Sequence, residues 1–144
     1  MKFVRFEIGK EKQYLENGVE DKLKGVNHHD THPTTGWSVT DDDIKKDLLL
    51  MKKLNINTIR TSHYPPSPRF LEMCDELGFY VILETDIETH GATIREAGGC
   101  DFDFLNNPLW PCSNPLWKDA FVDRMARAYQ RDKNHCSIFA WSTG

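Results

Sequence analysis

Three absences narrow what this sequence can be. No apolar run approaches the roughly 20 residues that a membrane-spanning helix needs, and the first ten residues lack the apolar core of a secretory signal peptide. Basic residues are not in excess, because the formal net charge is -4 and both signs are mixed along the chain. A nucleic-acid partner favours a basic face. We therefore expect a cytoplasmic protein that has neither a membrane nor a nucleic acid as its partner.

The chain also lacks closely spaced cysteines and a glycine-rich phosphate loop. Its four cysteines contain no C-x-x-C pair, which predicts four free thiols in a reducing compartment rather than a disulfide framework. The six histidines and four cysteines show no spacing typical of a zinc site. No G-x-G-x-x-G motif follows the first strand of the predicted main sheet, and this absence weakens a nucleotide-binding interpretation.

The sequence does contain a regular alternation of strand and helix patterns. Residues 3–21 predict a strand and a hairpin that turns at Asn17-Gly18, apart from the main sheet. Four strands are then predicted, at residues 23–27, 57–61, 79–83 and 137–141; the second has β-branched character, and the third is a continuous apolar run. Three helix patterns separate these strands; Thr40 caps the first, Ser67 caps the second, and Asn114-Pro115 opens the third.

The order β-α-β-α-β-α-β predicts an α/β fold with parallel strands and right-handed crossovers. Both a doubly wound sheet and part of an eight-stranded barrel fit this order. A complete barrel takes about 250 residues, so we expect a partial TIM barrel, a (βα)3β half-barrel of parallel strands preceded by a short β-hairpin. Residues 1–144 should form a single unit, with the hairpin in residues 1–21 and barrel strands 1–4 with helices 1–3 in residues 22–144.

Each predicted helix carries an apolar stripe that should face the sheet. The stripes are Ile44, Leu48 and Met51 in the first helix, with Leu50 and Leu54 beside them; Phe70, Leu71, Cys74 and Leu77 in the second; and Phe121, Val122, Met125 and Tyr129 in the third.

Polar residues end every predicted strand, and parallel strands bring such residues to one edge of a sheet. After the first strand come His28, His29 and His32, of which we expect one to face the cleft at this edge and the others to face solvent. The second strand ends at Arg60 and His63, and Ser142 follows the fourth. A rim of this composition suits a neutral, polyhydroxylated substrate.

Several roles remain open for these residues. Arg60 lies late in a strand that otherwise looks buried, where an unpaired guanidinium is costly; it pairs with Glu84 or Glu88, or it contacts a ligand. His63 either donates to a substrate hydroxyl or caps the turn that follows it. Glu88 and His90 point the same way if their segment is extended. They then supply two ligands for a divalent cation, whereas the alternative is a solvated loop start.

Four ordered motifs resemble glycoside hydrolase family two, and within it the bacterial β-galactosidases. The most specific is N-T-I-R-T-S-H-Y-P at residues 57–65, followed by D-E-L-G-F-Y-V at residues 75–81. G-V-N-H-H-D at residues 25–30 resembles the family's first barrel strand, where Arg is common at the position of His28. D-I-E-T-H-G at residues 86–91 and D-K-N-H-C-S-I-F-A-W-S at residues 132–142 resemble the third and fourth strands.

The resemblance implies a barrel enzyme that hydrolyses terminal β-linked galactosides such as lactose with retention of configuration. It implies that His29 and His63 bind the sugar, that Arg60 supports the catalytic carboxylates, and that Glu88 and His90 hold Mg²⁺. Retaining glycosidases use an acid/base and a nucleophile with carboxyl groups about 5–5.5 Å apart. The resemblance places both beyond residue 144, so the chain alone is expected to be inactive.

Other functions fit the same residues. A β-glucuronidase or another β-glycosidase of the family would share these motifs, because the loops that select the sugar lie elsewhere. A half-barrel that holds galactose or a metal ion without chemistry is an alternative from a different class. A third possibility is structural: four parallel strands leave two unpaired edges, which invite pairing between copies, so we expect a homo-oligomer.

Overall fold

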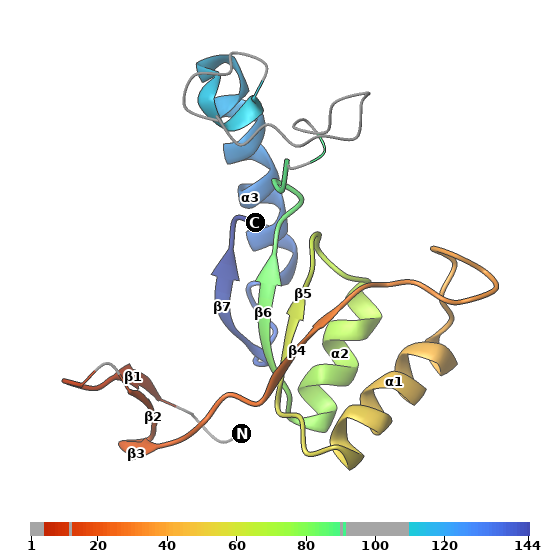
Figure 1. Ribbon diagram of the computed structural model, residues 1–144, viewed down its shortest axis with the longest axis vertical. Helices are drawn as coiled ribbons and strands as arrows, with labels where there is room; N and C mark the ends of the chain where they lie inside the picture. The colour runs from red at the N-terminus through yellow and green to blue at the C-terminus, as the bar shows by residue number, and fades with distance from the viewer. Residues whose placement is uncertain (1–4, 12, 90, 92–109) are drawn as a thin grey trace.

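Two separate sheets build the chain in the computed structural model, which describes residues 5–11, 13–89, 91 and 110–144. The first is antiparallel, in the order β1-β2-β3, and consists of β1 (Phe6–Ile8), β2 (Tyr14–Glu16) and β3 (Val19–Glu20). The second is parallel, in the order β4-β5-β6-β7, and consists of β4 (Gly25–His28), β5 (Thr58–Thr61), β6 (Tyr80–Glu84) and β7 (Ile138–Ser142). Figure 1 shows the small sheet near the amino-terminal ends of the parallel strands.

A helix lies in each crossover between the parallel strands. These helices are α1 (Asp41–Lys53), α2 (Pro68–Leu77) and α3 (Lys118–Asp132), the last preceded by the short 3-10 helices Pro111–Ser113 and Pro115–Trp117. The predicted alternation and the parallel α/β sheet are therefore confirmed. The strands follow one another in chain order, and all three helices share one hydrophobic core with the sheet. This is the arrangement of a barrel segment rather than that of a doubly wound sheet, which has helices on both faces.

Local capping signals explain where the elements begin and end. The Thr40 side chain accepts a hydrogen bond from the Asp43 amide, and Asp43 caps the Thr40 backbone in return, so α1 starts with a complete capping box. Gly78 ends α2 in the left-handed conformation, with φ of 69°. Asn17 and Gly18 both have positive φ, at 52° and 81°, which suits the tight turn between β2 and β3.

The core lies between the three helices and one face of the parallel sheet. Its buried members are Ile44, Leu48, Ile59, Phe70, Leu71, Met73, Cys74, Phe79, Val81, Leu83 and Ala128. Successive strand residues point to opposite faces, so Ile59, Val81 and Leu83 face the helices while Arg60 faces the other side. The parallel sheet thus leaves one face for polar side chains near the carboxyl ends of its strands.

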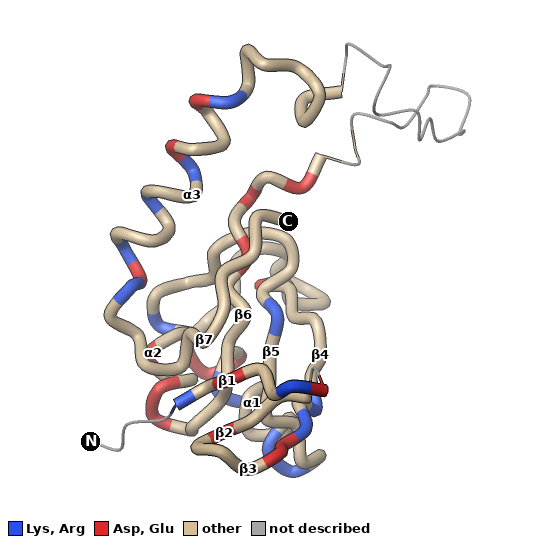
Figure 2. The backbone as a smooth tube through the Cα atoms, turned by 90° about the vertical axis from the view of Figure 1, so that its left-hand side faces the viewer, with Lys and Arg blue, Asp and Glu red and all other residues tan. Residues whose placement is uncertain are grey.

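The predicted apolar stripe on α3 is buried less than expected. In α3 the buried residues are Ala128 and Asp132, whereas Val122 and Tyr129 are exposed. For Val122 the reason is positional: the amino-terminal end of α3 rises beyond the carboxyl ends of the strands, so the sheet offers it no surface (Figure 2). Tyr129 lies in the last turn of α3 and packs against Trp141 of β7, but it remains exposed. Beside the α1 stripe, Leu50 and Leu54 are likewise exposed.

Aromatic side chains join the small sheet to the parallel one. The Phe6 ring lies 5.3 Å from that of Tyr80 and 5.7 Å from that of Phe139, and the Tyr80 hydroxyl donates to Glu16 at 2.6 Å. The hairpin therefore covers part of β6 and β7 without joining their sheet, as the sequence predicts.

No helix within the described ranges is long and apolar enough to cross a membrane. Cys74, Cys112 and Cys136 are free thiols, as predicted, and Cys100 lies outside the described residues.

Candidate active site

A buried ion pair connects neighbouring strands at the carboxyl edge of the sheet. Arg60, on β5, donates from Nε to Oε2 of Glu84 at 2.6 Å and from Nη2 to Oε1 at 2.9 Å. Arg60 Nη1 also donates to the Asn27 side chain on β4 at 3.2 Å. From β7, the Ser142 hydroxyl donates to Glu84 Oε2 at 3.0 Å. One network therefore crosses all four parallel strands.

Glu84 is the centre of this network. Its side chain is 0% exposed, whereas that of Arg60 is 33% exposed. Each of its oxygens has two hydrogen-bond partners, one nitrogen of the Arg60 fork and either His63 or Ser142. Burial raises the pKa of Glu84, but hydrogen bonds from His63, Arg60 and Ser142 outweigh burial and hold that pKa below its ordinary value. Glu84 is thus a fixed carboxylate, saturated with donors and closed to solvent.

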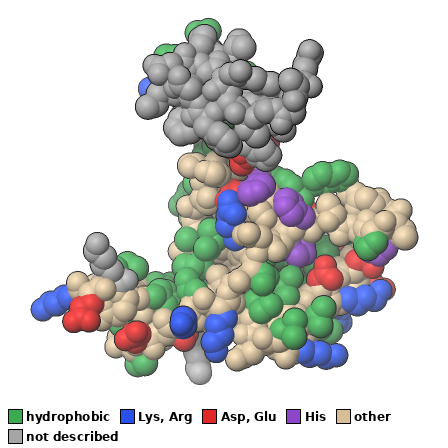
Figure 3. Space-filling view, in the orientation of Figure 1, with side chains coloured by type: hydrophobic (Ala, Val, Ile, Leu, Met, Phe, Trp, Pro, Cys, Tyr) green, Lys and Arg blue, Asp and Glu red, His purple; other side chains and the backbone are tan. Residues whose placement is uncertain are grey.

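Two histidines lie side by side next to this carboxylate. His63 Nδ1 is 2.7 Å from Glu84 Oε1, and the His63 side chain is 35% exposed. The His29 ring centre is 5.6 Å from that of His63, in an edge-on arrangement. His29 Nδ1 is 3.3 Å from the Tyr64 hydroxyl, which also accepts from the Asp30 amide. Figure 3 shows histidine side chains grouped with basic and acidic ones at this end of the sheet.

The structure therefore brings Arg60, His63 and His29 together at one rim. Arg60 pairs with Glu84, one of the two partners considered from the sequence. His63 contacts the Glu84 carboxylate, and no hydrogen bond in the described residues makes it a cap of the following turn.

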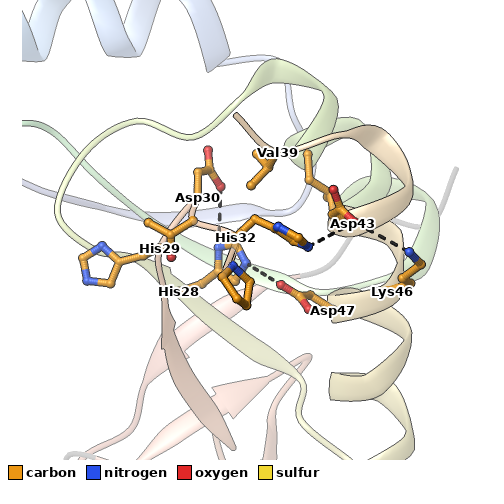
Figure 4. A pocket seen from close by; sticks show the side chains of 11 residues that line it. His28, His29, Asp30, His32, Val39, Asp43, Lys46 and Asp47 are labelled. Carbon is orange, nitrogen blue, oxygen red and sulfur yellow. Dashed lines mark ion pairs between the residues drawn. The ribbon is translucent and has the colours of Figure 1, made fainter. Parts of the chain in front are cut away.

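The other two histidines of this segment, His28 at the end of β4 and His32 after it, are placed differently from our expectation. His28 is not solvated: its side chain is 9% exposed, lies between Asp30 and Asp47 at 3.6 and 3.5 Å, and stacks on Phe70. His32 lies 3.9 Å from Asp43. Both line a cavity of about 250 Å³, which His29 lines as well, although the His29 ring points away from the other two histidines (Figure 4). Both rings lie close to carboxylates: that of His28 to Asp30 in the adjoining loop and to Asp47 of α1, and that of His32 to Asp43 of α1.

The predicted metal ligands are only partly within the described structure. Glu88 follows β6 and lies against Gly144, where an added Cβ would come within 2.9 Å of the Glu88 amide nitrogen. His90 lies outside the described residues. Among the residues that are described, no group of three metal-binding side chains is present. Glu88 alone offers the carboxylate oxygen that Mg²⁺ prefers, so the magnesium site remains a proposal.

Sequence reasoning gave Glu84 no functional role beyond pairing with Arg60, placed Ser142 at the rim without a partner, and missed Asn27. A signal for Glu84 was available. It is the first ionisable residue after an unbroken apolar run, and a carboxylate at the end of such a strand stays buried only with partners.

Comparison with known proteins decides the family. The profile described as glycosyl hydrolases family 2, TIM barrel domain, matches residues 6–144. The chain belongs to glycosyl hydrolase family 2. Its four-stranded sheet is a partial TIM barrel, and the polar network on the face opposite the helices is the one that a closed barrel turns inward.

Two relatives of the chain are β-galactosidases by name. A β-galactosidase from Arthrobacter sp. (strain B7) is 49% identical over 132 residues, 92% of this chain and 12% of the relative. A β-galactosidase from Streptococcus thermophilus is 46% identical over 144 residues, 99% of this chain and 13% of the relative. The chain thus spans about an eighth of the length of these relatives.

Solved structures of family 2 share the fold. A Bifidobacterium dentium β-glucuronidase in complex with coumarin-3-O-glucuronide superposes with a TM-score of 0.73 at 26% identity, over 96% of this chain and 19% of that one. An Eisenbergiella tayi β-galacturonidase bound to galacturonate superposes with a TM-score of 0.67 at 30% identity, over 96% of this chain and 21% of that one.

The lowered pKa of Glu84 predicts acid sensitivity. Because the folded-state pKa lies below the ordinary value of about 4.3, the ionised network stabilises the fold fully above that pH. This stability is lost as the pH falls from there through the folded-state pKa. Urea unfolding at a series of pH values should show the fall, and Glu84→Gln should make the profile flatter. An unchanged profile in a folded Glu84→Gln variant would contradict the assignment.

Proposed function

We propose that this chain forms one wall of the sugar site of a retaining β-galactosidase that cleaves terminal β-D-galactosides. The observation that carries the proposal is the rim of Arg60, His63 and His29 around the buried Glu84 carboxylate. In a TIM barrel, binding and catalytic groups lie at the carboxyl ends of the strands. The two relatives named above, both β-galactosidases, are 49% and 46% identical to the chain, which supports galactose as the sugar.

In this proposal His29 and His63 hold sugar hydroxyls, and Arg60 places positive charge beside the reacting centre. Glu84 is neither the acid/base nor the nucleophile, since four donors saturate its oxygens and solvent does not reach it. Glu88 and His90 would contribute to a Mg²⁺ site beside the backbone that follows β7. When bound, Mg²⁺ would offset negative charge among the carboxylates at the rim. A cytoplasmic location is part of the same proposal.

A chimaera tests the sugar assignment. The segment of the Streptococcus thermophilus β-galactosidase that aligns with residues 1–144 is exchanged for this chain, and hydrolysis of chromogenic β-galactosides and β-glucuronides is compared. We expect the chimaera to keep β-galactosidase activity within about tenfold of the parent, a difference of about 1.4 kcal/mol in the barrier. A folded chimaera that loses this activity, or one that prefers the β-glucuronide, would contradict the proposal.

The chain by itself should not hydrolyse a chromogenic β-galactoside. Hydrolysis with retention needs two suitably placed carboxyl groups, and Glu84 cannot serve as one of them. Purified residues 1–144, produced in a host without its own galactosidase, should therefore give no turnover, and calorimetry with galactose should show weak or no binding. Turnover that copurifies with the chain would contradict this expectation, and tight galactose binding would favour the binding-module alternative.

We also propose that copies of the isolated chain associate through the two sheet edges. In the described sheet, β4 and β7 each pair with one strand only, so each leaves backbone groups that a second copy can pair with. Sedimentation velocity should show a dimer or larger species whose proportion rises with concentration. A monomer at all concentrations would argue against this proposal.

A further inference from the structure

The contact between Glu84 and His63 decides where the imidazole carries its proton. A neutral imidazole has one protonated and one bare nitrogen, and the hydrogen bonds around the ring select between them. His63 Nδ1 lies 2.7 Å from Glu84 Oε1, a short distance that requires one hydrogen between the two atoms. The question is which atom supplies that hydrogen.

The surroundings of Glu84 answer this question. Its oxygens already receive hydrogen bonds from Arg60 Nε, Arg60 Nη2 and the Ser142 hydroxyl. A carboxylate that faces this many donors is ionised and can only accept, so the hydrogen belongs to His63 Nδ1. Arg60 Nη2 also lies 3.3 Å from His63 Nδ1 and has two hydrogens, one of which goes to Glu84 Oε1 at 2.9 Å. Even if the other points at His63, a bare Nδ1 would face Oε1 of the carboxylate at 2.7 Å with no hydrogen between two acceptors, which is unfavourable.

We propose that Glu84 is a positioning residue that keeps the proton of His63 on Nδ1 and so presents a bare Nε2 at the rim as a hydrogen-bond acceptor. Nε2 lies on the side of the ring away from Nδ1 and therefore away from buried Glu84. Among the described residues no hydrogen bond to this nitrogen is present. The complementary ligand group is a hydroxyl that donates its hydrogen.

This inference rests on the proposed function for the identity of the ligand, and it adds the direction of the hydrogen bond between His63 and the sugar. The sugar hydroxyl at His63 is the donor, whereas the sequence allowed His63 itself to donate. His29 contrasts with His63, because its Nδ1 faces the Tyr64 hydroxyl, which can both donate and accept. Its proton position is therefore not determined in the same way. The surroundings therefore fix the position of the ring proton in His63 but not in His29.

Nitrogen NMR of the ¹⁵N-labelled chain reads the proton position directly, because protonated and bare ring nitrogens resonate far apart. The measurement is made without sugar, at a pH well above the ordinary histidine pKa of about 6.5. A hydrogen bond to a charged acceptor favours one form by more than about tenfold. We expect His63 to show protonated Nδ1 and bare Nε2. A His63 signal with bare Nδ1 would overturn the proposal.

The variant Glu84→Gln tests whether Glu84 is the cause. An amide presents either an oxygen or an NH₂ group, so the preference at His63 should fall from more than tenfold towards equal populations. His135 provides an internal control, since its Nδ1 lies 2.7 Å from Asp75 and its signals should stay unchanged. Asp75→Asn should produce the reverse, a change at His135 and none at His63. An unchanged Nδ1–H preference at His63 in folded Glu84→Gln would overturn the role of Glu84.

If Glu84→Gln does not fold, the wild-type spectrum still decides. Protonated Nδ1 supports the proposal and bare Nδ1 overturns it. The NMR measurement is made without sugar, so its result does not depend on whether the chimaera acts on galactosides. The proposal on the His63 proton and the proposed function can therefore fail separately.

Discussion

Replacing Arg60 by methionine is expected to lower the free energy of unfolding by about 3 kcal/mol. The change keeps much of the apolar stem but removes both charged hydrogen bonds to Glu84, whose side chain is 0% exposed. Removing one partner of a buried ion pair costs about 3–5 kcal/mol, because the other charge is left uncompensated. His63 and Ser142 still donate to Glu84, so we expect the lower end of that range. Urea unfolding followed by circular dichroism measures the effect.

Arg127→Met is the matched control for this prediction. Arg127 pairs with Asp123 one turn earlier on α3, but its side chain is 81% exposed. Exposed pairs contribute about 0–1 kcal/mol, so this variant should unfold at nearly the wild-type urea concentration. The double variant Arg60→Met/Glu84→Gln should lose less than the sum of the two single changes. Equal effects of Arg60→Met and Arg127→Met would show that the network at the rim does not stabilise the fold.

Replacing Phe70 by alanine is expected to cost about 3–5 kcal/mol, the usual range for truncating a buried phenylalanine. The Phe70 ring is 0% exposed and belongs to the core that α1, α2 and the strands share. It also supports His28, whose ring stacks on it with centres 4.9 Å apart. Total stability of a domain is only about 5–15 kcal/mol, so the variant should be partly unfolded or melt much earlier in a thermal scan.

Leu116→Ala is the control for Phe70→Ala, because Leu116 is 89% exposed and should change stability by less than about 0.5 kcal/mol. Similar losses in the two variants would mean that the core described between α2 and the sheet does not hold the chain together.

The sequence contained most of the information needed for the parallel sheet. A continuous apolar run predicted β6, β-branched residues predicted β5, and the capping residues Thr40 and Ser67 marked where α1 and α2 begin. Because side chains at the ends of parallel strands must meet at one edge, the gathering of Arg60, His63 and His29 followed from topology alone.

Other features depend on contacts that periodicity does not show. The stripe on α3 was periodic, but whether Val122 is buried depends on how far the sheet extends beside the helix. The burial of His28 depends on Asp47, a residue of α1 that approaches it only in the fold. Likewise, Glu84 has a central position because donors from β5, the loop after β5 and β7 converge on it, and no short motif contains all of them.

The central claim is that the rim around Glu84 faces the sugar, and the galactosidase chimaera tests it most directly through kcat/KM for a β-galactoside. His63→Ala should lower kcat/KM by at least about 100-fold, the effect of losing one well-placed hydrogen bond to the transition state. His32→Ala is the control, since the His32 ring points toward Asp43 of α1 and away from the His29 ring (Figure 4), and should leave kcat/KM within a few-fold. If both variants retain the activity of the unmodified chimaera, the rim is not part of the sugar site.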